Sequence, residues 1–278
     1  MAHSLGLINF FLFFIAGLLL YQYSNTFRYY FKVYFLYGWI VFWSVAFLPI
    51  ILIRRRTVEN GRILRLVMVP LKYIYGIKLI VQGATNLDLK GPYVIVANHQ
   101  GSLDWFGMFQ IWPQRSTLIV KREVLYYFFV GLHCWLAGFF FINRKKKEEA
   151  IETMSTIRDV MVRDKLRVWV FPEGTRNYES SMLPFKKGAF HLAIQAQVPI
   201  VAVVMSSFQP FLNTKMKKFT TGEVTIRILP PVKTEGLSSA DVTELMNRVR
   251  ETMLSTYHEI SKDYGKQASI TKEGNCKT

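Results

Sequence analysis

The sequence predicts an α/β fold in which a mostly parallel β-sheet is flanked by helices and preceded by an N-terminal hydrophobic helical hairpin. Short apolar segments of strand length alternate with helix-length segments from Ile77 onward, which is typical of a parallel sheet with covering helices. Two long apolar runs lie before residue 57, and polar residues follow directly after two of the expected strands. The 278 residues therefore divide into a membrane-anchoring hairpin (1–56), an α/β domain (57–265) and a polar tail (266–278) for which composition predicts disorder.

The hairpin is expected from apolar runs at Leu5–Tyr21 and from Val33 or Phe35 to Ile53, joined by a loop at Gln22–Lys32. No basic segment precedes the first run and no small-residue cleavage motif follows it, so we expect a retained anchor rather than a cleaved signal peptide. Arg54–Arg56 end the second run, and arginines in that position favour the cytosolic side of a membrane. The lengths fit both a hairpin that crosses the bilayer and one that enters a single leaflet.

The composition favours anionic partners at a membrane. The chain is 51% hydrophobic and carries a net charge of +16, which suits a lipid bilayer surface and phosphorylated ligands. Paired zinc ligands and a glycine–aromatic RNA-binding pattern do not occur in the sequence, so nucleic acid is not an expected partner. Cys134 and Cys276 provide neither a disulfide framework nor a metal-ligand cluster, and we expect no metal site and no cofactor.

Seven strands are expected in the α/β domain, each as a short apolar segment. They are Leu79–Gln82, Tyr93–Ala97, Thr117–Val120, Phe139–Ile142, Arg167–Phe171, Ile200–Met205 and Val224–Leu229. Helices are expected between or after them, at Leu103–Trp112, Val124–Trp135, Lys147–Arg163, Gly188–Gln197 and Ala240–Lys262.

Two further segments leave alternatives open. Glu59–Gly76 has the pattern of an amphipathic helix interrupted by Pro70, which suits either the membrane surface or packing within the domain. Tyr126–Ile142 is apolar enough for a third membrane span, but its two glycines and His133 favour a buried helix followed by a strand. Such a helix could border an apolar ligand channel, and His133 would then be a packed or channel residue.

A first polar island, Asn98-His99-Gln100-Gly101-Ser102-Leu103-Asp104, follows the strand Tyr93–Ala97. Residues five apart do not share a helical face, so His99 and Asp104 can meet only if His99 lies in the turn and Asp104 in the first turn of the next helix. Ser102 is the candidate N-cap of that helix. A carboxylate that fixes the tautomer of an imidazole makes a general base for a hydroxyl, and an ordinary polar contact is the alternative for the pair taken alone.

A second polar island, Phe171-Pro172-Glu173-Gly174-Thr175-Arg176-Asn177, lies at the end of the strand Val168–Phe171. Gly174 allows close backbone approach, and Arg176 offers a planar pair of donors for a phosphate. Strand ends at one edge of a parallel sheet are where such folds bind ligands. The island therefore predicts an anion site, with a solvated loop as the alternative.

These islands, with Phe141-Ile142-Asn143-Arg144 and Val198-Pro199-Ile200, resemble in order and spacing the four blocks of the glycerolipid acyltransferases. More specifically, the chain resembles the eukaryotic 1-acyl-sn-glycerol-3-phosphate acyltransferases (lysophosphatidic acid acyltransferases) of the alpha/beta type. The resemblance extends over roughly residues 55–260. It implies transfer of a fatty acyl group from acyl-coenzyme A, as co-substrate, to the sn-2 hydroxyl of lysophosphatidic acid, giving phosphatidic acid.

The resemblance also implies roles for individual residues. His99 would take the proton of the hydroxyl, and Asp104 would orient the imidazole. Arg176 is the first choice for the acceptor's phosphate, with Lys121 and Arg144 as supporting cations.

The remaining expected substrate-binding residues are Glu173, Gly174 and Thr175. Glu173 would hydrogen-bond a glycerol hydroxyl or brace Arg176. The resemblance further implies residence in the endoplasmic reticulum membrane, with the catalytic domain on the cytosolic side.

Other functions are compatible with these motifs. The acceptor could be another lysophospholipid or glycerol-3-phosphate, because the motifs hardly separate these substrates. A non-enzymatic membrane lipid-binding protein is a third alternative, but a binding module has no need of the base that His99 and Asp104 would form.

Overall fold

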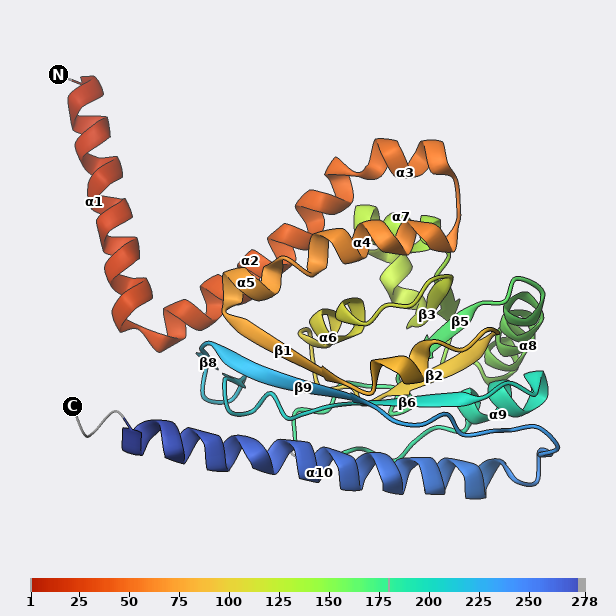
Figure 1. Cartoon of the computed structure of the whole chain (residues 1–278). Coiled ribbons are helices and arrows are strands. Elements are labelled where there is room, and N and C mark those ends of the chain that lie inside the picture. The colour runs from red at the N-terminus through yellow and green to blue at the C-terminus, as the bar shows by residue number, and fades with distance from the viewer. Residues whose placement is uncertain (1, 180, 275–278) are drawn as a thin grey trace.

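A seven-stranded β-sheet with the order β1-β9-β6-β2-β5-β3-β4 forms the centre of the computed structural model, which describes residues 2–179 and 181–274 (Figure 1). Its strands are β1 (Ile77–Gln82), β2 (Tyr93–Ala97), β3 (Ser116–Lys121), β4 (Phe140–Ile142), β5 (Arg167–Val170), β6 (Ile200–Met205) and β9 (Gly222–Ile228). The strands from β6 to β4 run parallel, whereas β9 is antiparallel to β6 and pairs with β1 in parallel. The expected mostly parallel sheet and its seven expected strands are confirmed.

Helices cover both faces of this sheet (Figure 1). One face carries α8 (Lys147–Arg163), α9 (Gly188–Ala196) and α10 (Val242–Gly274). The other carries α4 (Gly61–Met68), α5 (Leu71–Tyr75), α6 (Asp104–Gln110) and α7 (Phe128–Leu136). Short 3₁₀ helices lie at η1 (Val58–Asn60), η2 (Ala84–Leu87) and η3 (Arg122–Tyr126).

β2 lies in the middle of the sheet and divides the core into two parts. Val94 and Val96 join the apolar cluster under α8, α9 and α10, whereas Ile95 and Ala97 join the cluster that contains α6. Neighbouring residues of a strand point to opposite faces, and a strand covered on both faces needs apolar side chains on both. Its continuous apolar sequence is therefore what this central position requires.

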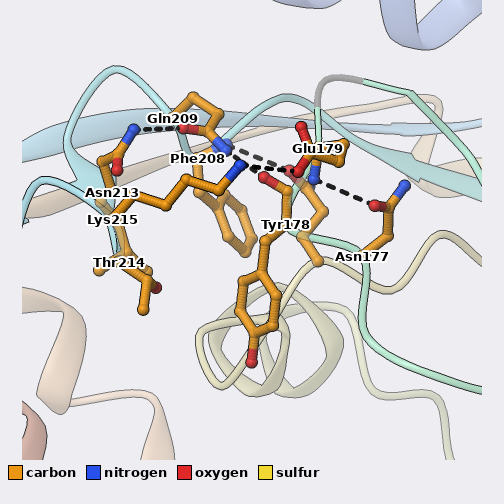
Figure 2. A pocket seen from close by; sticks show the side chains of 10 residues that line it. Asn177, Tyr178, Glu179, Phe208, Gln209, Asn213, Thr214 and Lys215 are labelled. Carbon is orange, nitrogen blue, oxygen red and sulfur yellow. Dashed lines mark hydrogen bonds and ion pairs between the residues drawn. The ribbon is translucent and has the colours of Figure 1, made fainter.

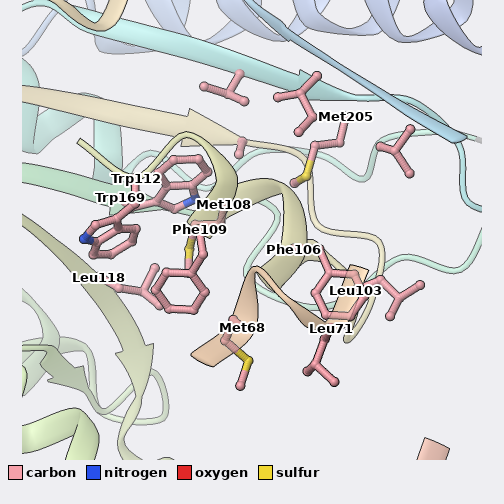
Figure 3. Packing of buried hydrophobic residues seen from close by; sticks show 14 of the residues in the cluster. Met68, Leu71, Leu103, Phe106, Met108, Phe109, Trp112, Leu118, Trp169 and Met205 are labelled. Carbon is pink, nitrogen blue, oxygen red and sulfur yellow. The ribbon is translucent and has the colours of Figure 1, made fainter. Parts of the chain in front are cut away.

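An aromatic cluster on the second face holds α6 in place (Figure 3). The rings of Phe109 and Trp112 lie 5.2 Å apart between centroids, and Trp112 stacks on Trp169 of β5 at 6.3 Å. Phe106 and Met108 are also almost completely buried. Because α6 begins at Asp104, this packing fixes the position of that carboxylate.

The N-terminal helices α1 (Ala2–Tyr23) and α2 (Asn25–Ala46) form an open V that turns at Ser24 (Figure 1). The expected loop at Gln22–Lys32 is wrong, because only Ser24 interrupts the helices; its side chain accepts a hydrogen bond from the Phe27 backbone N–H and so begins α2 at once. α1 is long and apolar enough to cross a membrane, and no residue of its apolar stretch is buried. After a bend of 51°, α2 is followed by α3 (Leu48–Arg54).

α2 packs against the α/β domain. The Tyr75 hydroxyl donates to the Lys32 carbonyl at 2.7 Å, and the Trp39 indole N–H donates to the Val67 carbonyl at 3.1 Å. The Lys32 ammonium lies 4.8 Å from the centre of the Phe219 ring, within the range of a cation–π interaction. The predicted boundary at residue 56 therefore divides two segments that share a packed interface.

Two segments in the C-terminal half of the chain contain secondary structure that the sequence did not predict. The strands β7 (Leu212–Asn213) and β8 (Lys218–Phe219) form a small hairpin, which is too short to show an alternating pattern in the sequence. α10 continues to Gly274, so helical backbone extends into the tail for which composition predicts disorder. The last four residues of that tail, 275–278, lie outside the described part of the chain.

The apolar segment Tyr126–Ile142 forms the end of η3, then α7 and β4, and thus a helix followed by a strand as expected. Burial, however, is restricted to one face of α7: Phe128 is 86% exposed, while His133 and Cys134 are buried. Neither ring nitrogen of His133 has a hydrogen-bond partner among the described residues. Burial lowers the pKa of His133 to about 4.

We expect His133 to make the folded protein sensitive to acid. In the unfolded chain the imidazole binds a proton near pH 6.5, whereas the folded chain binds it only near pH 4, so the free energy of unfolding decreases as the pH falls through this window. The decrease between pH 7 and pH 5 is about 2 kcal/mol. Thermal unfolding in detergent at both pH values should show a smaller loss for His133→Leu than for the wild type. The matched change at the exposed His258 should leave the loss unaltered, and an equal loss in all three proteins would contradict the prediction.

Candidate active site

The parallel strands β2, β5, β3 and β4 lie side by side and end at the same edge of the sheet. β2 leads to His99, β5 leads to Glu173 and Arg176, β3 ends at Lys121, and Arg144 follows β4. The carboxyl edge of a parallel sheet is the usual location of ligand sites in α/β folds. The topology therefore gathers these residues at one edge, although they lie far apart in the sequence.

His99 and Asp104 are in direct contact. His99 lies in the turn after β2 and Asp104 is the first residue of α6, with 2.6 Å between Nδ1 and Oδ2. The same carboxylate oxygen accepts the backbone N–H groups of Gln100 at 2.8 Å and Gly101 at 2.9 Å. A carboxylate can only accept, so Nδ1 carries the proton, and Nε2 presents its lone pair away from Asp104. This geometry suits a general base.

The imidazole is also held from its ring face and its backbone. The Phe171 ring stacks on His99 with a centroid distance of 4.2 Å and an interplanar angle of 22°. The Glu173 carboxylate accepts the His99 backbone N–H at 2.7 Å and, through its other oxygen, the Leu183 backbone N–H at 2.9 Å. Glu173 is buried, and burial raises the pKa of its carboxyl group. Glu173 thereby joins the loop after β2 to the segment before α9, and its expected contact with a glycerol hydroxyl or Arg176 stays a prediction.

Three cations surround the loop at Gly174. The Arg144 guanidinium donates to the Gly174 carbonyl, and burial lowers the pKa of Arg144. Gly174 has a φ of +74°, and a Cβ placed there would lie 2.8 Å from Cε of Lys186. The positive φ favours glycine at this position, whereas the flexible end of the Lys186 side chain could move aside for a Cβ. Arg144, Lys186 and Arg176 thus place positive charge around the loop, which suits an anion.

Arg176 lies at the surface next to Tyr37 of α2 and Tyr178. Partial burial by itself would lower the pKa of Arg176, but hydrogen bonds to Tyr178 and Tyr37 hold that pKa above its ordinary value. Its neighbour Thr175 is exposed. Lys121 is also exposed and lies 6.0 Å from the centre of the Tyr127 ring, on the side of the site formed by η3.

The expected role of Ser102 as a helix cap is wrong. α6 begins at Asp104 with Leu103 at the N-cap position, and no side chain caps it. Ser102 Oγ instead lies 2.9 Å from the phenol oxygen of Tyr37. The Asp104 carboxylate accepts the Gln100 and Gly101 backbone N–H groups, which precede the helix, and so orders the turn that leads into α6.

Sequence reasoning missed several residues that shape this site. The Asn98 amide exchanges two hydrogen bonds with the Met205 backbone, at 2.9 and 2.8 Å, and thereby ties the end of β2 to β6. The Gln100 amide donates to the Met205 and Ser206 carbonyls. Both residues belong to the first polar island and could have been suspected from it. Tyr37 lies within an apolar run, where one more aromatic residue gives no signal.

A cavity of about 230 Å³ lies beside the turn that carries His99 (Figure 2). Its lining is mixed: Gln100 and Gln209 contribute polar groups, and Phe208 and Leu212 contribute apolar ones. The Asn177 backbone N–H, in the same wall, donates to the His99 carbonyl at 2.7 Å. The cavity therefore adjoins the backbone of the turn that carries His99.

A family model described as Acyltransferase matches residues 78–206, which contain both polar islands and extend from β1 to the end of β6. The fold, the site and this match define the class of protein as an acyltransferase. The chain is 51% identical over 240 residues to 1-acyl-sn-glycerol-3-phosphate acyltransferase alpha of Homo sapiens, covering 86% of this chain and 85% of that protein. It is 45% identical over 248 residues to the human beta protein, covering 88% and 89%. The chain belongs to the 1-acyl-sn-glycerol-3-phosphate acyltransferase family.

Two more distant proteins extend the comparison. The 1-acyl-sn-glycerol-3-phosphate acyltransferase of Saccharomyces cerevisiae is 41% identical over 192 residues, covering 68% of this chain and 63% of that protein. The crystal structure of the 1-acyl-sn-glycerophosphate (LPA) acyltransferase PlsC from Thermotoga maritima aligns with a TM-score of 0.57 at 22% identity. It covers 88% of this chain and 97% of that chain, and at this identity the likeness concerns the fold.

We expect Glu173→Gln to destabilise the folded protein by about 2 kcal/mol. The amide keeps one acceptor oxygen, but its NH₂ group faces a backbone N–H that then has no partner, and an unsatisfied buried donor costs about 1–3 kcal/mol. Chemical unfolding in detergent would measure the difference. Glu179→Gln is the control, because Glu179 is exposed and its carboxylate pairs with the exposed Lys215. Equal stability of the two variants would contradict the structural role of Glu173.

Proposed function

We propose that the chain transfers a fatty acyl group from acyl-coenzyme A to the sn-2 hydroxyl of lysophosphatidic acid and so produces phosphatidic acid. The observation that carries this proposal is the His99–Asp104 contact of 2.6 Å at a sheet edge surrounded by cations. A base next to an anion site fits an acceptor that has both a reactive hydroxyl and a phosphate. The names of the relatives at 45% and 51% identity support this choice of acceptor.

In the proposed reaction His99 acts as the general base. Its Nε2 takes the proton of the acceptor hydroxyl while the hydroxyl oxygen attacks the thioester carbonyl. The new ester C–O bond forms, the C–S bond breaks, and the proton on the imidazolium passes to the coenzyme A thiolate. Asp104 stabilises the imidazolium, and base assistance of this kind contributes about 10²–10⁴-fold to the rate.

Transfer is proposed to be direct, without an acyl-enzyme. Ser102 is the hydroxyl residue nearest to His99 in the sequence, and its Oγ is hydrogen-bonded to the Tyr37 phenol. Cys134 is buried on α7, and burial raises the pKa of its thiol to about 12, so it stays protonated and unreactive. No cofactor other than the acyl-coenzyme A co-substrate takes part in the proposed reaction.

The phosphate of the acceptor is assigned to Arg176, with Lys121 and Arg144 as supporting cations. Arg176 presents a planar set of donors at the edge of the site, and such charge-assisted bonds contribute about 1.5–3 kcal/mol. Gly174 and Thr175 belong to the proposed substrate-binding loop. Lys186 joins this set because its side chain lies against Gly174.

The proposed location is the endoplasmic reticulum membrane, with the α/β domain on the cytosolic side. α1 supplies the apolar stretch Leu5–Tyr23. In addition, Phe128 and Trp135 of α7 are exposed. The Arg56 guanidinium lies 5.4 Å from the centre of the Trp135 ring, and aromatic and basic residues together suit the headgroup region of a bilayer. The assignment to this membrane rests on the resemblance to the family.

We expect His99→Ala to lower the rate of acyl transfer at least about 10²-fold, because the hydroxyl loses its base. The release of coenzyme A from purified protein in detergent, with lysophosphatidic acid as acceptor, would measure the rate. A panel of lysophospholipids and glycerol-3-phosphate, run in parallel, tests the choice of acceptor. His258→Ala, an exposed histidine on α10, is the control. A fully active His99→Ala protein would overturn the mechanism.

We expect Arg176→Ala to raise the KM for lysophosphatidic acid about tenfold or more while leaving the KM for acyl-coenzyme A unchanged. The reason is the loss of a charge-assisted contact with the acceptor's phosphate. Arg248→Ala, which removes an exposed arginine of α10, is the matched control for net charge. An unchanged KM for lysophosphatidic acid in Arg176→Ala would refute this role.

A further inference from the structure

A cluster of four cations lies at the outer corner of the sheet edge that holds the proposed active site. Arg122 directly follows β3, Lys145 and Lys146 follow β4, and Lys147 begins α8. All four residues are exposed, and none of them belongs to the residues proposed for the acceptor's phosphate. We call these four residues the corner cluster.

A single carboxylate holds the corner cluster together. Glu149, in the first turn of α8, pairs with the Arg122 guanidinium at 3.1 Å and with the Lys146 ammonium at 2.7 Å. The Asn143 amide donates to the same carboxylate at 2.9 Å, and its carbonyl oxygen accepts the Lys145 backbone N–H at 3.1 Å. Hydrogen bonds from Lys146 and Asn143 hold the pKa of Glu149 below its ordinary value, so this carboxylate stays ionised. The segments after β3 and β4 are thus joined to α8 with their cations side by side.

The positive charge at this corner exceeds what its carboxylates balance. Residues 121–123 and 144–149 contain six lysines and arginines against three glutamates. Exposed ion pairs contribute little to stability, so folding does not account for this concentration of charge. Neighbouring cations repel one another, and a polyanion that binds between them relieves the repulsion. The corner therefore suits a ligand that carries several phosphate charges.

The width of the sheet separates this corner from the acceptor's phosphate. β2, which leads to His99, and β4 are separated by β5 and β3. Neighbouring strands lie about 4.8 Å apart, so the carboxyl ends of β2 and β4 are roughly 14 Å apart. In lysophosphatidic acid only four covalent bonds join the reactive oxygen to the phosphorus, which keeps these two atoms within about 6 Å of each other. The acceptor's phosphate therefore does not reach the corner while its hydroxyl contacts His99.

Acyl-coenzyme A has the length and the charge that the corner requires. Its pantetheine arm lies between the thioester and the diphosphate and is about as long as four extended residues, roughly 14 Å. With the thioester at His99, the arm can pass along the sheet edge over the ends of β5 and β3. The diphosphate and the 3′-phosphate then arrive at the end of β4.

We propose that the corner cluster is the subsite for the phosphate groups of acyl-coenzyme A. This inference rests on the proposed function, because it takes the donor of that reaction and assigns a place to its phosphates. The acceptor's phosphate stays near Arg176, in the loop after β5. The two anionic substrates thus occupy different parts of one cationic edge, which keeps their charges apart.

The test compares three oleoyl donors that differ in their phosphates: the coenzyme A thioester, the dephospho-coenzyme A thioester without the 3′-phosphate, and the pantetheine thioester without any phosphate. The corner variant is Arg122→Gln/Lys146→Gln. With lysophosphatidic acid as acceptor in detergent, we expect this variant to lower kcat/KM for the coenzyme A thioester about tenfold or more. The value for the pantetheine thioester and the KM for lysophosphatidic acid should stay unchanged.

The helix control, Arg158→Gln/Arg163→Gln, removes the same net charge from elsewhere on α8. Arg158 pairs with Asp159 at 2.7 Å and Arg163 with Asp164 at 2.8 Å, so these arginines are also partners of carboxylates. They lie further along the helix, away from the residues that follow β4. We expect the helix control to discriminate among the three donors as the wild type does.

Direct binding separates the subsite from the reaction. Calorimetric titration with coenzyme A and with dephospho-coenzyme A needs no turnover. We expect the corner variant to bind coenzyme A about tenfold more weakly than the wild type. Lys145→Gln/Lys147→Gln is a second corner variant that keeps the ion pairs of Glu149, and it should weaken the binding of coenzyme A in the same direction. The melting temperature of each variant accompanies these measurements.

Three results would overturn the proposal: unchanged use and binding of the coenzyme A compounds by the corner variant, an equal fall of kcat/KM for the pantetheine thioester, or an equal fall in the helix control. Cations that contact only bilayer phosphates would give the first result. Should the corner variant fail to fold, unchanged binding by the second corner variant would overturn the proposal as well.

The proposed function and the subsite can fail separately. A wild-type protein that does not acylate lysophosphatidic acid would refute the proposed function, and the titrations would still support or refute the subsite. An active wild type together with an unaffected corner variant would refute only the subsite.

Discussion

The geometry of the site depends on one buried oxygen atom, Oδ2 of Asp104. This oxygen accepts the His99 imidazole and the backbone N–H groups of Gln100 and Gly101 within 2.9 Å. Burying a carboxylate is costly unless it is hydrogen-bonded, so the turn and the charge stabilise each other. Because Asp104 begins α6, the aromatic packing of Phe109 and Trp112 against Trp169 also fixes the orientation of His99.

Two carboxylates at the same edge of the sheet have different partners. Asp104 receives the imidazole, whereas Glu173 receives the His99 and Leu183 backbone N–H groups. Both carboxylates are buried and engaged by these donors. The charges around Gly174 that are exposed are those of Arg144, Lys186 and Arg176, so positive and negative groups are separated at this edge.

The sheet could be predicted from sequence because its strands are buried. β2 and β6 need apolar residues on both faces, and this requirement produces the continuous runs at Tyr93–Ala97 and Ile200–Met205. The contact between His99 and Asp104 could be anticipated from their spacing, whereas the partners of Glu173 could not, because backbone N–H groups have no sequence pattern. The contact of Tyr37 depends on how α2 packs on the domain, and an apolar run contains no information about its own rotation.

The packing of α2 on the domain has a consequence for how the protein is made. α2 is synthesised early, but Phe219, on which Lys32 lies, belongs to a hairpin near the end of the fold. During synthesis the face of α2 that contains Lys32 and Leu36 stays exposed until the sheet has formed. Pairing between segments so distant in sequence is slow to form, since the intervening chain must be ordered first. The N-terminal helices α1 and α2 are thus synthesised first, and the contacts of α2 with the domain are among the last to form.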